Sequence, residues 1–442
     1  MSRPQSHDAP DAQVAGFERP VARCCDGETR DEGRRGDAKY LVDAGTFLDA
    51  VQARLAESLA FAAEAGDAVT AGLPSSTLVE VSSLEVLVED LLGAGGKLVR
   101  PRLVRLGYLA ARASARRGDG DSAGESLTDR CDVVGVDETA QVKHGAAIPF
   151  GAATISRTAP TGADDAALTD AVVRVAAAFE LLHLFGLLQD DVMDASDTRR
   201  GRPAAHRRVS AAAAQPDGPD AARLGDSIAV LAGDLAFALA NRLVRGLPEH
   251  VADAWDAAVV ELVTGQRLDL VFAAETRLDE VSTRRVAHAK SGAYTVQRPL
   301  EIGALLAGES VPPAWLSRFG AALGEAFALA DDIIGLWGEP AVTGKPAGED
   351  LRERKPSTVL GLADSALDGE LTRRLAPGRE PLDEAETRTW LERLDAAGVR
   401  ARATERIAER HADALDALAA LPQGAVRDEL TRFADELAVR DA

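Results

Sequence analysis

Apolar residues recur every three or four positions along most of the chain, which is the spacing of one face of an α-helix. The pattern starts near Tyr40 with FLDAVQARLAESLAFAAEAG and returns in TLVEVSSLEVLVEDLL. The second stretch leads into GAGGKLVRPRL, where the glycines predict the end of one helix and Pro101 the first turn of the next. Long helical runs follow at about 165–194, 221–246, 250–275, 279–307 and 314–338, and shorter ones at about 382–397, 400–420 and 424–440.

Strand-like alternation is scarce, and no repeat of roughly 20–50 residues points to a solenoid. Helices without a sheet bury their apolar stripes against one another. We therefore expect an all-α fold, with one domain of long packed helices over residues 40–442.

Two segments lack the helical pattern. Residues 1–39 are polar, charged and interspersed with proline and glycine, which predicts a disordered N-terminal tail. Residues 117–163 are poor in periodic apolar positions, as is typical of a functional loop or a disordered insertion. We interpret this second segment as a flexible insertion between two helices.

The composition favours helices and narrows the range of partners. Of the 442 residues, 46% are hydrophobic but only 4% are aromatic, so the core must consist mainly of alanine, leucine and valine. The formal net charge of −21 argues against a nucleic-acid partner and against a basic membrane-binding surface. An acidic protein can still bind an anion where basic side chains converge or metal ions bridge.

Cysteine usage and the N-terminus bear on cellular location. The chain has an odd number of cysteines (Cys24, Cys25 and Cys131), whose spacing predicts neither a disulfide framework nor a zinc site. The N-terminus has no apolar signal core, and no uninterrupted apolar run reaches the roughly 18 residues of a membrane span. We expect a cytoplasmic protein without a membrane span.

The stretch LLQDDVMDASDTRRGRP places aspartates and arginines directly after an apolar helical run. In a helix, Asp190 and Asp194 share one face, while Asp191 is turned about 100° aside. Carboxylates one turn apart repel each other unless a positive charge lies between them. Magnesium is a natural candidate, because it prefers oxygen ligands from carboxylates, water and substrate phosphates.

Basic side chains accompany these aspartates. Arg199 and Arg200 follow the helix, where they could bind a phosphate as bidentate donors, and His183 lies about two turns before Asp190. A charged helix end in a very acidic protein would explain the aspartates alone. The adjacent arginines favour a site at which metal ions and cations together hold a diphosphate.

A second acidic pair occurs in FALADDIIGLWGEPAVTGKPAGEDLRERKPS. Asp331 and Asp332 end an apolar run, and the loop that follows carries Lys345 and Lys355. Two such arrangements on separate helices suggest carboxylates that face each other across a bundle, with metal ions and a polyanion between them.

Two further segments carry isolated cations. Lys97 and Arg100 lie next to a helix start, where free N–H groups favour anions, although surface cations at a capping loop are the simpler interpretation. Lys290 lies inside the apolar segment HAKSGAYTVQRPLEIGALLAG. A lysine in such a place either reaches the surface or points into a cavity at an anion.

In this order, the four segments resemble the trans-isoprenyl diphosphate synthases, or polyprenyl synthetases, over about residues 41–440. GGKxxRP matches Gly95–Pro101, DDxxD with RRG matches Asp190–Gly201, a lysine-hydroxyl-glycine segment matches Lys290–Gly292, and the second aspartate-rich motif with its GKP loop matches Asp331–Pro346. The resemblance implies a bundle of long helices around a central cavity, and it is strongest to bacterial geranylgeranyl diphosphate synthases. The family is usually homodimeric.

The resemblance also implies the reaction. An allylic diphosphate ionises, isopentenyl diphosphate attacks the resulting cation in the trans configuration, and a proton is lost. About three magnesium ions and several basic side chains would stabilise the departing diphosphate, while the apolar bundle excludes water. No protein nucleophile is needed, because the released diphosphate can take the proton.

Motif matches assign a role to each candidate residue. Magnesium would be bound by Asp190, Asp194 and Asp331, with Asp191 and Asp332 in support. The allylic diphosphate would be held by Arg199, Lys290, Ser291 and Lys345, and isopentenyl diphosphate by Lys97, Arg100, His183 and Arg200. Lys355 would close the site. Of these, the expected catalytic residues are Asp190, Asp191, Asp194, Arg199, Arg200, Lys290, Asp331 and Asp332.

The chain departs from the usual family pattern at four positions. Gly335 stands where the second motif often has a third aspartate, and Ala328 replaces a common glutamine. Gln189 replaces a frequent histidine, and Leu98 a frequent arginine. Gly335 and Ala328 motivate one alternative, a non-catalytic regulatory or scaffold subunit with a synthase fold.

Two other questions stay open in the sequence. A terpene cyclase also uses DDxxD and magnesium, but it would not need the site of Lys97 and Arg100 for a second diphosphate. Some bacterial relatives use disordered extensions to enter protein shells, which is an alternative to a dispensable tail at residues 1–39.

Product length in the family depends on side chains beneath the first aspartate motif. Phe185 lies five residues before Asp190, and Gly186 four residues before it. One bulky ring beside a residue without a side chain suggests a floor of medium depth. We expect a twenty-carbon geranylgeranyl product, with fifteen-carbon farnesyl next, while geranyl or longer products stay possible.

Overall fold

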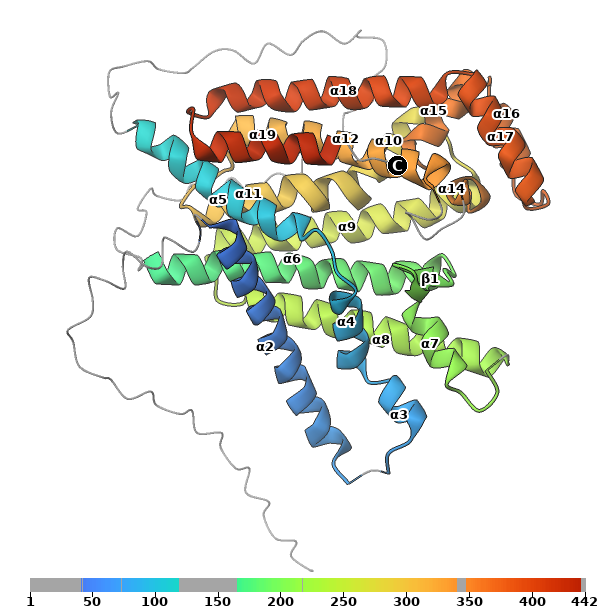
Figure 1. The fold of residues 1–442 in the computed structure, drawn as a ribbon, viewed down its shortest axis with the longest axis horizontal. Helices are drawn as coiled ribbons and strands as arrows, with labels where there is room; N and C mark the ends of the chain where they lie inside the picture. The colour runs from blue at the N-terminus through green and yellow to red at the C-terminus, as the bar shows by residue number, and fades with distance from the viewer. Residues whose placement is uncertain are drawn as a thin grey trace, which may run out of the picture.

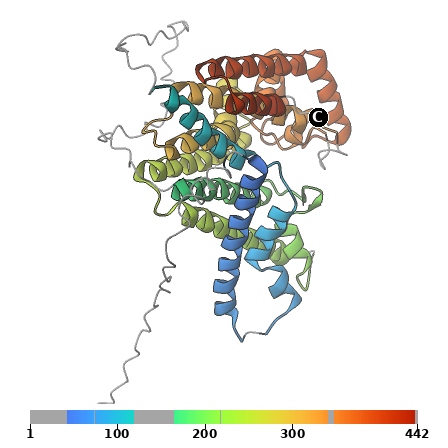
Figure 2. The ribbon, with the colours of Figure 1, turned by 60° about the vertical axis from the view of Figure 1, so that its left-hand side comes forward.

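The computed structural model shows a bundle of long α-helices, seen in Figures 1 and 2. It describes residues 41–438 apart from 42, 73, 119–164, 217 and 340–346. The tail predicted at residues 1–39, nearly all of the insertion predicted at 117–163, and Lys345 therefore lie outside the described residues.

The first half of the bundle holds the helices up to Glu275. They are α2 (Ala44–Thr70), α3 (Thr77–Val81), α4 (Leu84–Gly93), α5 (Val99–Gly118), α6 (Asp165–Met193), α7 (Ala205–Ala211), α8 (Pro219–Val244) and α9 (Glu249–Glu275). Within the described ranges, the strands are the two-residue β1 (Thr198–Arg199) and β2 (Arg202–Pro203), which form an antiparallel hairpin between α6 and α7.

The second half continues the same architecture. Its elements are α10 (Glu280–Ala287), a π-helix (His288–Gln297), α11 (Arg298–Leu306), α12 (Ala314–Trp337), α14 (Glu349–Arg352), α15 (Thr358–Ala366), α16 (Glu370–Leu375), α17 (Glu384–Ala396), α18 (Val399–Ala417), a 3-10 turn (Leu418–Ala420) and α19 (Ala425–Ala438). The prediction of an all-α fold is confirmed.

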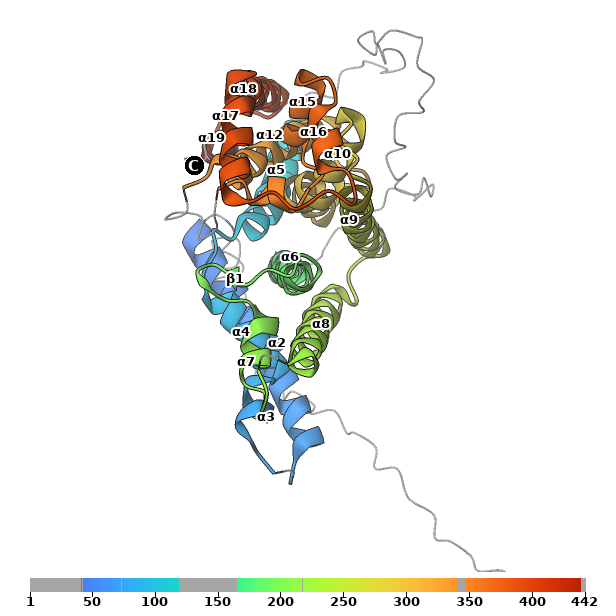
Figure 3. The same cartoon turned by 90° about the vertical axis from the view of Figure 1, so that its right-hand side faces the viewer.

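Helix α6 lies at the centre of the bundle. Figure 3 shows it between a group formed by α2, α4, α7 and α8 and a second group that includes α5, α9, α12 and the C-terminal helices. Phe179 of α6 is fully buried and packs edge-on against Trp255 of α9, with 5.2 Å between the ring centroids. Burial around α6 on all sides explains why its sequence is apolar over so long a run.

Two predicted helical runs differ from the observed elements. The run at 77–92 is divided into α3 and α4, because the Ser83 side chain accepts a hydrogen bond from the Val86 N–H and starts a new helix. The run at 279–307 contains the π-helix between two α-helices. Backbone contact between Gly292 and Gly324 of α12 lies within this segment, since a Cβ on Gly292 would be 2.8 Å from the Gly324 carbonyl oxygen.

Two helices of the described chain are long and apolar enough to cross a membrane. They are Ala166–Met193 and Pro219–Val244, and 72% and 44% of their most apolar windows are buried inside the protein. The core helix of a bundle passes the same test, so their length and composition are weak evidence for a span. The expected absence of a membrane span stays a prediction.

Candidate active site

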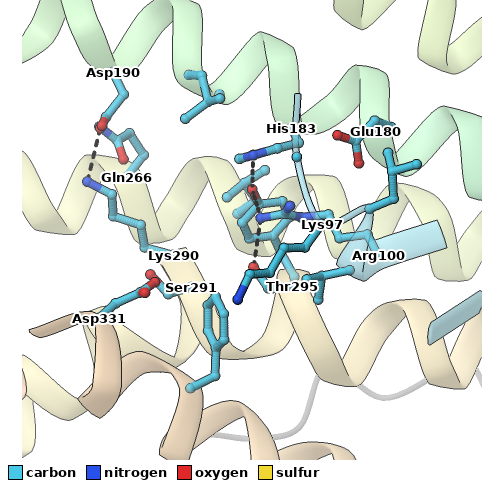
Figure 4. Close-up of a pocket in the computed structure, with 18 of the residues that line it drawn as sticks. Lys97, Arg100, Glu180, His183, Asp190, Gln266, Lys290, Ser291, Thr295 and Asp331 are labelled. Atoms are coloured by element: carbon cyan, nitrogen blue, oxygen red, sulfur yellow. Dashed lines mark hydrogen bonds and ion pairs between the residues drawn. The ribbon is translucent and has the colours of Figure 1, made fainter. Parts of the chain in front are cut away.

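A cavity of about 440 Å³ opens between α6, α9, the π-helix, α12 and the loop before α5. Figure 4 shows the polar side chains that point into it. The structure brings nine of the predicted residues to its wall: Lys97, Arg100, His183, Gly186, Asp190, Arg200, Lys290, Ser291 and Asp331. These residues come from four segments that are far apart in the sequence.

Helical spacing places the side chains of α6 and the π-helix in the cavity. Glu180, His183 and Asp190 recur on one face of α6 at three- and seven-residue steps. The π-helix turns Lys290 and Ser291 toward the cavity, and one turn later Tyr294 and Thr295. π-Helical segments are rare and frequently occur at functional sites.

The acidic end of the cavity centres on Asp190. Its carboxylate accepts hydrogen bonds from Lys290 Nζ at 3.0 Å and from Gln266 Nε2 at 3.0 Å. Lys290 Nζ also donates to Asp269 Oδ2 at 2.6 Å. Burial alone would raise the pKa of Asp190, but the Lys290 and Lys355 ammonium groups outweigh it and hold the pKa at about 2. Asp190 is therefore ionised at neutral pH.

Lys355 reaches this end from the opposite side of the bundle. Its Nζ lies 3.2 Å from Asp194 Oδ2, 2.8 Å from Glu353 Oε2 and 3.7 Å from Asp350 Oδ1. Burial lowers the pKa of Lys355, but the surrounding carboxylates, led by Asp350, raise it well above its usual value. Burial, followed by the charge of Asp190, raises the pKa of Asp194. Neither Asp194 nor Lys355 is among the residues that line the cavity wall.

Asp191 and Arg199 contact each other rather than the cavity. Asp191 is 2% exposed, and its Oδ1 accepts hydrogen bonds from Arg199 Nε at 2.8 Å and from Nη2. Arg199 Nη2 also lies 3.8 Å from Asp190 Oδ2. The pair thus ties the β1–β2 hairpin to the end of α6.

Asp331 and Asp332, adjacent in sequence, have different surroundings. Asp331 lines the cavity on the wall opposite Asp190 (Figure 4). Asp332 instead accepts a hydrogen bond from the Val359 N–H at 3.2 Å, in the first turn of α15. Burial, followed by repulsion from Asp350, raises the pKa of Asp332 well above its usual value. The structure therefore places Asp332 against α15, and its supporting role beside Asp331 stays a prediction.

A second polar cluster lies at the other end of the cavity. Arg100 is 8% exposed, and its Nη2 donates to the Tyr294 hydroxyl and, at 2.9 Å, to Thr295 Oγ1. The Tyr294 hydroxyl also lies 2.8 Å from His183 Nδ1. Burial, reinforced by Arg100, lowers the pKa of His183 well below its usual value, so its ring is neutral at neutral pH. Lys97 completes this end (Figure 4).

The sequence motifs did not identify several residues of this site. Gln266 lines the cavity, and Asp269, which accepts a hydrogen bond from Lys290, lies three positions later on α9. This spacing would have marked them as a polar pair on one face. Glu180, 4% exposed, lines the cavity three residues before His183, where a carboxylate on a buried helix is itself unusual. Tyr294 carried no signal, because a lone tyrosine in an apolar run is typical of the core.

The predicted chain-length residues occupy different places. Gly186 lines the cavity. The Phe185 ring instead packs against Phe237 of α8, with ring centroids 5.1 Å apart and planes inclined by 32°. The two rings therefore form a layer beside the cavity, between α6 and α8.

The donor set fits magnesium that arrives with a diphosphate. Among the described residues, no group of three His, Cys, Asp or Glu side chains is arranged to hold a metal by itself. Magnesium, however, commonly uses one or two carboxylates together with water and substrate phosphates. Asp190 and Asp331 face the same cavity from opposite helices and supply such oxygens (Figure 4).

Comparisons with known proteins agree with this geometry. The chain is 33% identical over 275 residues to the geranylgeranyl diphosphate synthase of Mycobacterium tuberculosis, covering 60% of this chain and 73% of that protein. It is 37% identical over 207 residues to the (2E,6E)-farnesyl diphosphate synthase of the same species, covering 46% of this chain and 53% of that protein.

Solved structures show the same architecture. The fold matches a Corynebacterium glutamicum geranylgeranyl pyrophosphate synthase, crystallised with isoprenyl diphosphate and magnesium, with a TM-score of 0.67 and 27% identity. That match covers 90% of this chain and 100% of the other. Residues 152–386, more than half of the chain, match the polyprenyl synthetase family model, and the chain therefore belongs to the polyprenyl synthetase family.

Proposed function

We propose that the protein is a magnesium-dependent trans-prenyltransferase that condenses isopentenyl diphosphate with an allylic diphosphate. The observation that carries this proposal is one cavity with two anion-binding ends. Carboxylates with Lys290 lie at one end, and Lys97 with Arg100 lies at the other (Figure 4). A reaction between two diphosphates needs two such ends, with an apolar stretch between them for the reacting carbons.

The residues support each part of the chemistry. At the acidic end, magnesium would be held by Asp190 and Asp331, where it would neutralise the departing diphosphate. Lys290 hydrogen-bonds the leaving oxygens, and an apolar wall that includes Leu262 and Phe327 keeps water from the allylic cation. At the other end, Arg100 binds the diphosphate of isopentenyl diphosphate, so that its double bond is directed toward the cation.

We propose geranylgeranyl diphosphate as the main product and farnesyl diphosphate as the second candidate. Gly186 lines the cavity and leaves space beneath the first aspartate motif. The adjacent Phe185 ring, packed on Phe237, would limit how far the growing prenyl chain extends. The two Mycobacterium tuberculosis relatives are named for these same two products.

The decisive experiment supplies labelled isopentenyl diphosphate with dimethylallyl, geranyl or farnesyl diphosphate and separates the products by chromatography. Incorporation into a twenty-carbon chain with magnesium present supports the proposal. A complete lack of incorporation with every primer would favour the non-catalytic subunit. A hydrocarbon formed from geranylgeranyl diphosphate alone would favour a terpene cyclase.

We further propose that the enzyme is a cytoplasmic homodimer. Helices α8 and α9 carry exposed apolar side chains, including Leu231, Val260 and Val263, which are 48%, 59% and 49% exposed. Apolar side chains that gather on a helix face commonly mark an interface. We propose that a second copy of the chain covers these side chains, as expected for an enzyme of this family.

A further inference from the structure

Gly335 lies one turn after Asp331 on α12, where the family pattern often has a third aspartate. A Cβ on this glycine would lie 2.0 Å from Asp350 Oδ2 and 2.5 Å from Asp350 Cγ. Neither distance is compatible with a real Cβ. The carboxylate of Asp350 therefore occupies the space that a side chain at position 335 would use.

The fold holds Asp350 in this place. The Gly348 N–H donates to the Leu336 carbonyl at 3.0 Å, which joins the start of α14 to the end of α12. Leu351 is 0% exposed and packs into the core beside α12, α15 and α17. Because Gly348 and Leu351 are both held in place, the backbone of Asp350 between them stays next to Gly335.

Asp350 in turn contacts Lys355. The Lys355 N–H donates to the Asp350 carbonyl at 2.9 Å, and Lys355 Nζ lies 3.7 Å from Asp350 Oδ1. The same Nζ lies 3.2 Å from Oδ2 of Asp194, on the first aspartate motif. The lysine thus joins Asp194 of the first aspartate motif to Asp350 and Glu353 of the segment around α14.

We propose that Asp350 replaces the side chain missing at Gly335 and acts as a positioning residue that holds Lys355 against the first aspartate motif. Gly335 is then a requirement of the site rather than a sign of decay, because any side chain there would displace the Asp350 carboxylate. The inference rests on the proposed function, since it concerns the same diphosphate end of the cavity.

The test compares Gly335→Ala, Asp350→Ala and the double variant. Binding of inorganic diphosphate with magnesium is measured by calorimetry, and the melting temperature is measured alongside. Each single variant should bind diphosphate about tenfold more weakly, as expected for a lost contact to a charged group. The double variant should be no weaker than the worse single one, because the added methyl acts only through the carboxylate.

Gly66→Ala in α2 is the matched control, because a Cβ there meets nothing within 4 Å. It should raise the melting temperature, as glycine-to-alanine changes in helices usually do. Gly335→Ala should lower the melting temperature in the natural chain but raise it in the Asp350→Ala background, where the atoms that meet the added methyl are absent. In turnover assays, both single variants should raise KM for the allylic diphosphate and leave KM for isopentenyl diphosphate unchanged.

Additive losses in the double variant, or a Gly335→Ala protein that binds diphosphate as tightly as the natural chain, would overturn the inference. The proposed function fails in a different way. In that case the natural chain would not bind diphosphate with magnesium at all. The effect of Gly335→Ala on the melting temperature, with and without the Asp350 side chain, would still test the contact between the two positions.

Discussion

At the scale of single residues, Tyr294 joins two side chains that the motifs assign to one substrate. Its hydroxyl contacts both Arg100 Nη2 and His183 Nδ1, and the Arg100 guanidinium lies 4.3 Å from the centre of its ring. A buried arginine and a neutral histidine are thereby held in one orientation before substrate binds. Such fixed donors bind an anion at a low entropic cost.

We expect Tyr294→Phe to raise KM for isopentenyl diphosphate about tenfold, because one hydrogen bond to a charged group is lost while the ring is kept. KM for the allylic diphosphate should change little. Initial rates measured with each substrate varied in turn distinguish the two. Tyr108→Phe is the control, since that hydroxyl accepts a hydrogen bond from Arg112 away from the cavity. An equal rise of both KM values would argue against this role.

The pKa of Asp190 predicts a pH dependence of stability. A carboxyl whose pKa is about 2 in the folded protein and about 3.9 when unfolded stabilises the fold above pH 4 and loses this contribution as the pH falls toward 2. Asp190→Asn should therefore lower the free energy of unfolding by about 2 kcal/mol at pH 7. Denaturant titrations should show this difference shrinking at pH 3. A difference that grows in acid would contradict the ionised carboxylate.

At the scale of elements, the motif spacings predicted which helices carry the chemistry but not the shape of the helix that carries Lys290. The apolar positions over residues 279–307 are compatible with one continuous α-helix. A π-helix has a slightly wider spacing of apolar positions, and the pattern is too irregular to distinguish the two. The close contact within this π-helix, of Gly292 with Gly324, joins residues far apart in sequence. The contact of Asp332 with Val359 could not be predicted for the same reason, since Val359 belongs to another helix.

We expect Gly292→Ala to destabilise the protein by about 1–3 kcal/mol, because its Cβ would press on the Gly324 carbonyl. The π-helix would have to shift, and binding of magnesium diphosphate should weaken with it. Denaturant unfolding and calorimetry measure the two effects. Gly93→Ala, where a Cβ meets nothing within 4 Å, is the control. Unchanged stability would show that the two helices can separate at no cost.

Helices α6 and α8 meet through the rings of Phe185 and Phe237. Removal of the Phe185 ring would open space beneath the first aspartate motif. Phe185→Ala should therefore lengthen the main product by one or more isoprene units. Chromatography of the products with a farnesyl primer measures this. Phe61→Ala, which removes a ring that is 45% exposed on α2, should leave the product unchanged. An unaltered product from Phe185→Ala would place the floor elsewhere.

At the scale of the whole molecule, the sequence predicted an all-α bundle because its long amphipathic runs leave no other way to bury their apolar faces. It also predicted that two acidic helix ends would meet across one cavity, which Asp190 and Asp331 do. It could not predict that Lys355 would bridge to Asp194, because this contact depends on how α14 packs against α12.

The exposed apolar residues of α9 predict the oligomeric state. Val260 and Val263 are 59% and 49% exposed and lie three positions apart on one face. If a second copy covers them, Val263→Glu buries an unpaired charge at the interface and should convert dimers to monomers in sedimentation equilibrium. Val69→Glu, at a residue 82% exposed near the end of α2, should not. If sedimentation equilibrium shows that the natural chain is a monomer, the homodimer is excluded. The reaction would then take place in the cavity of a single copy.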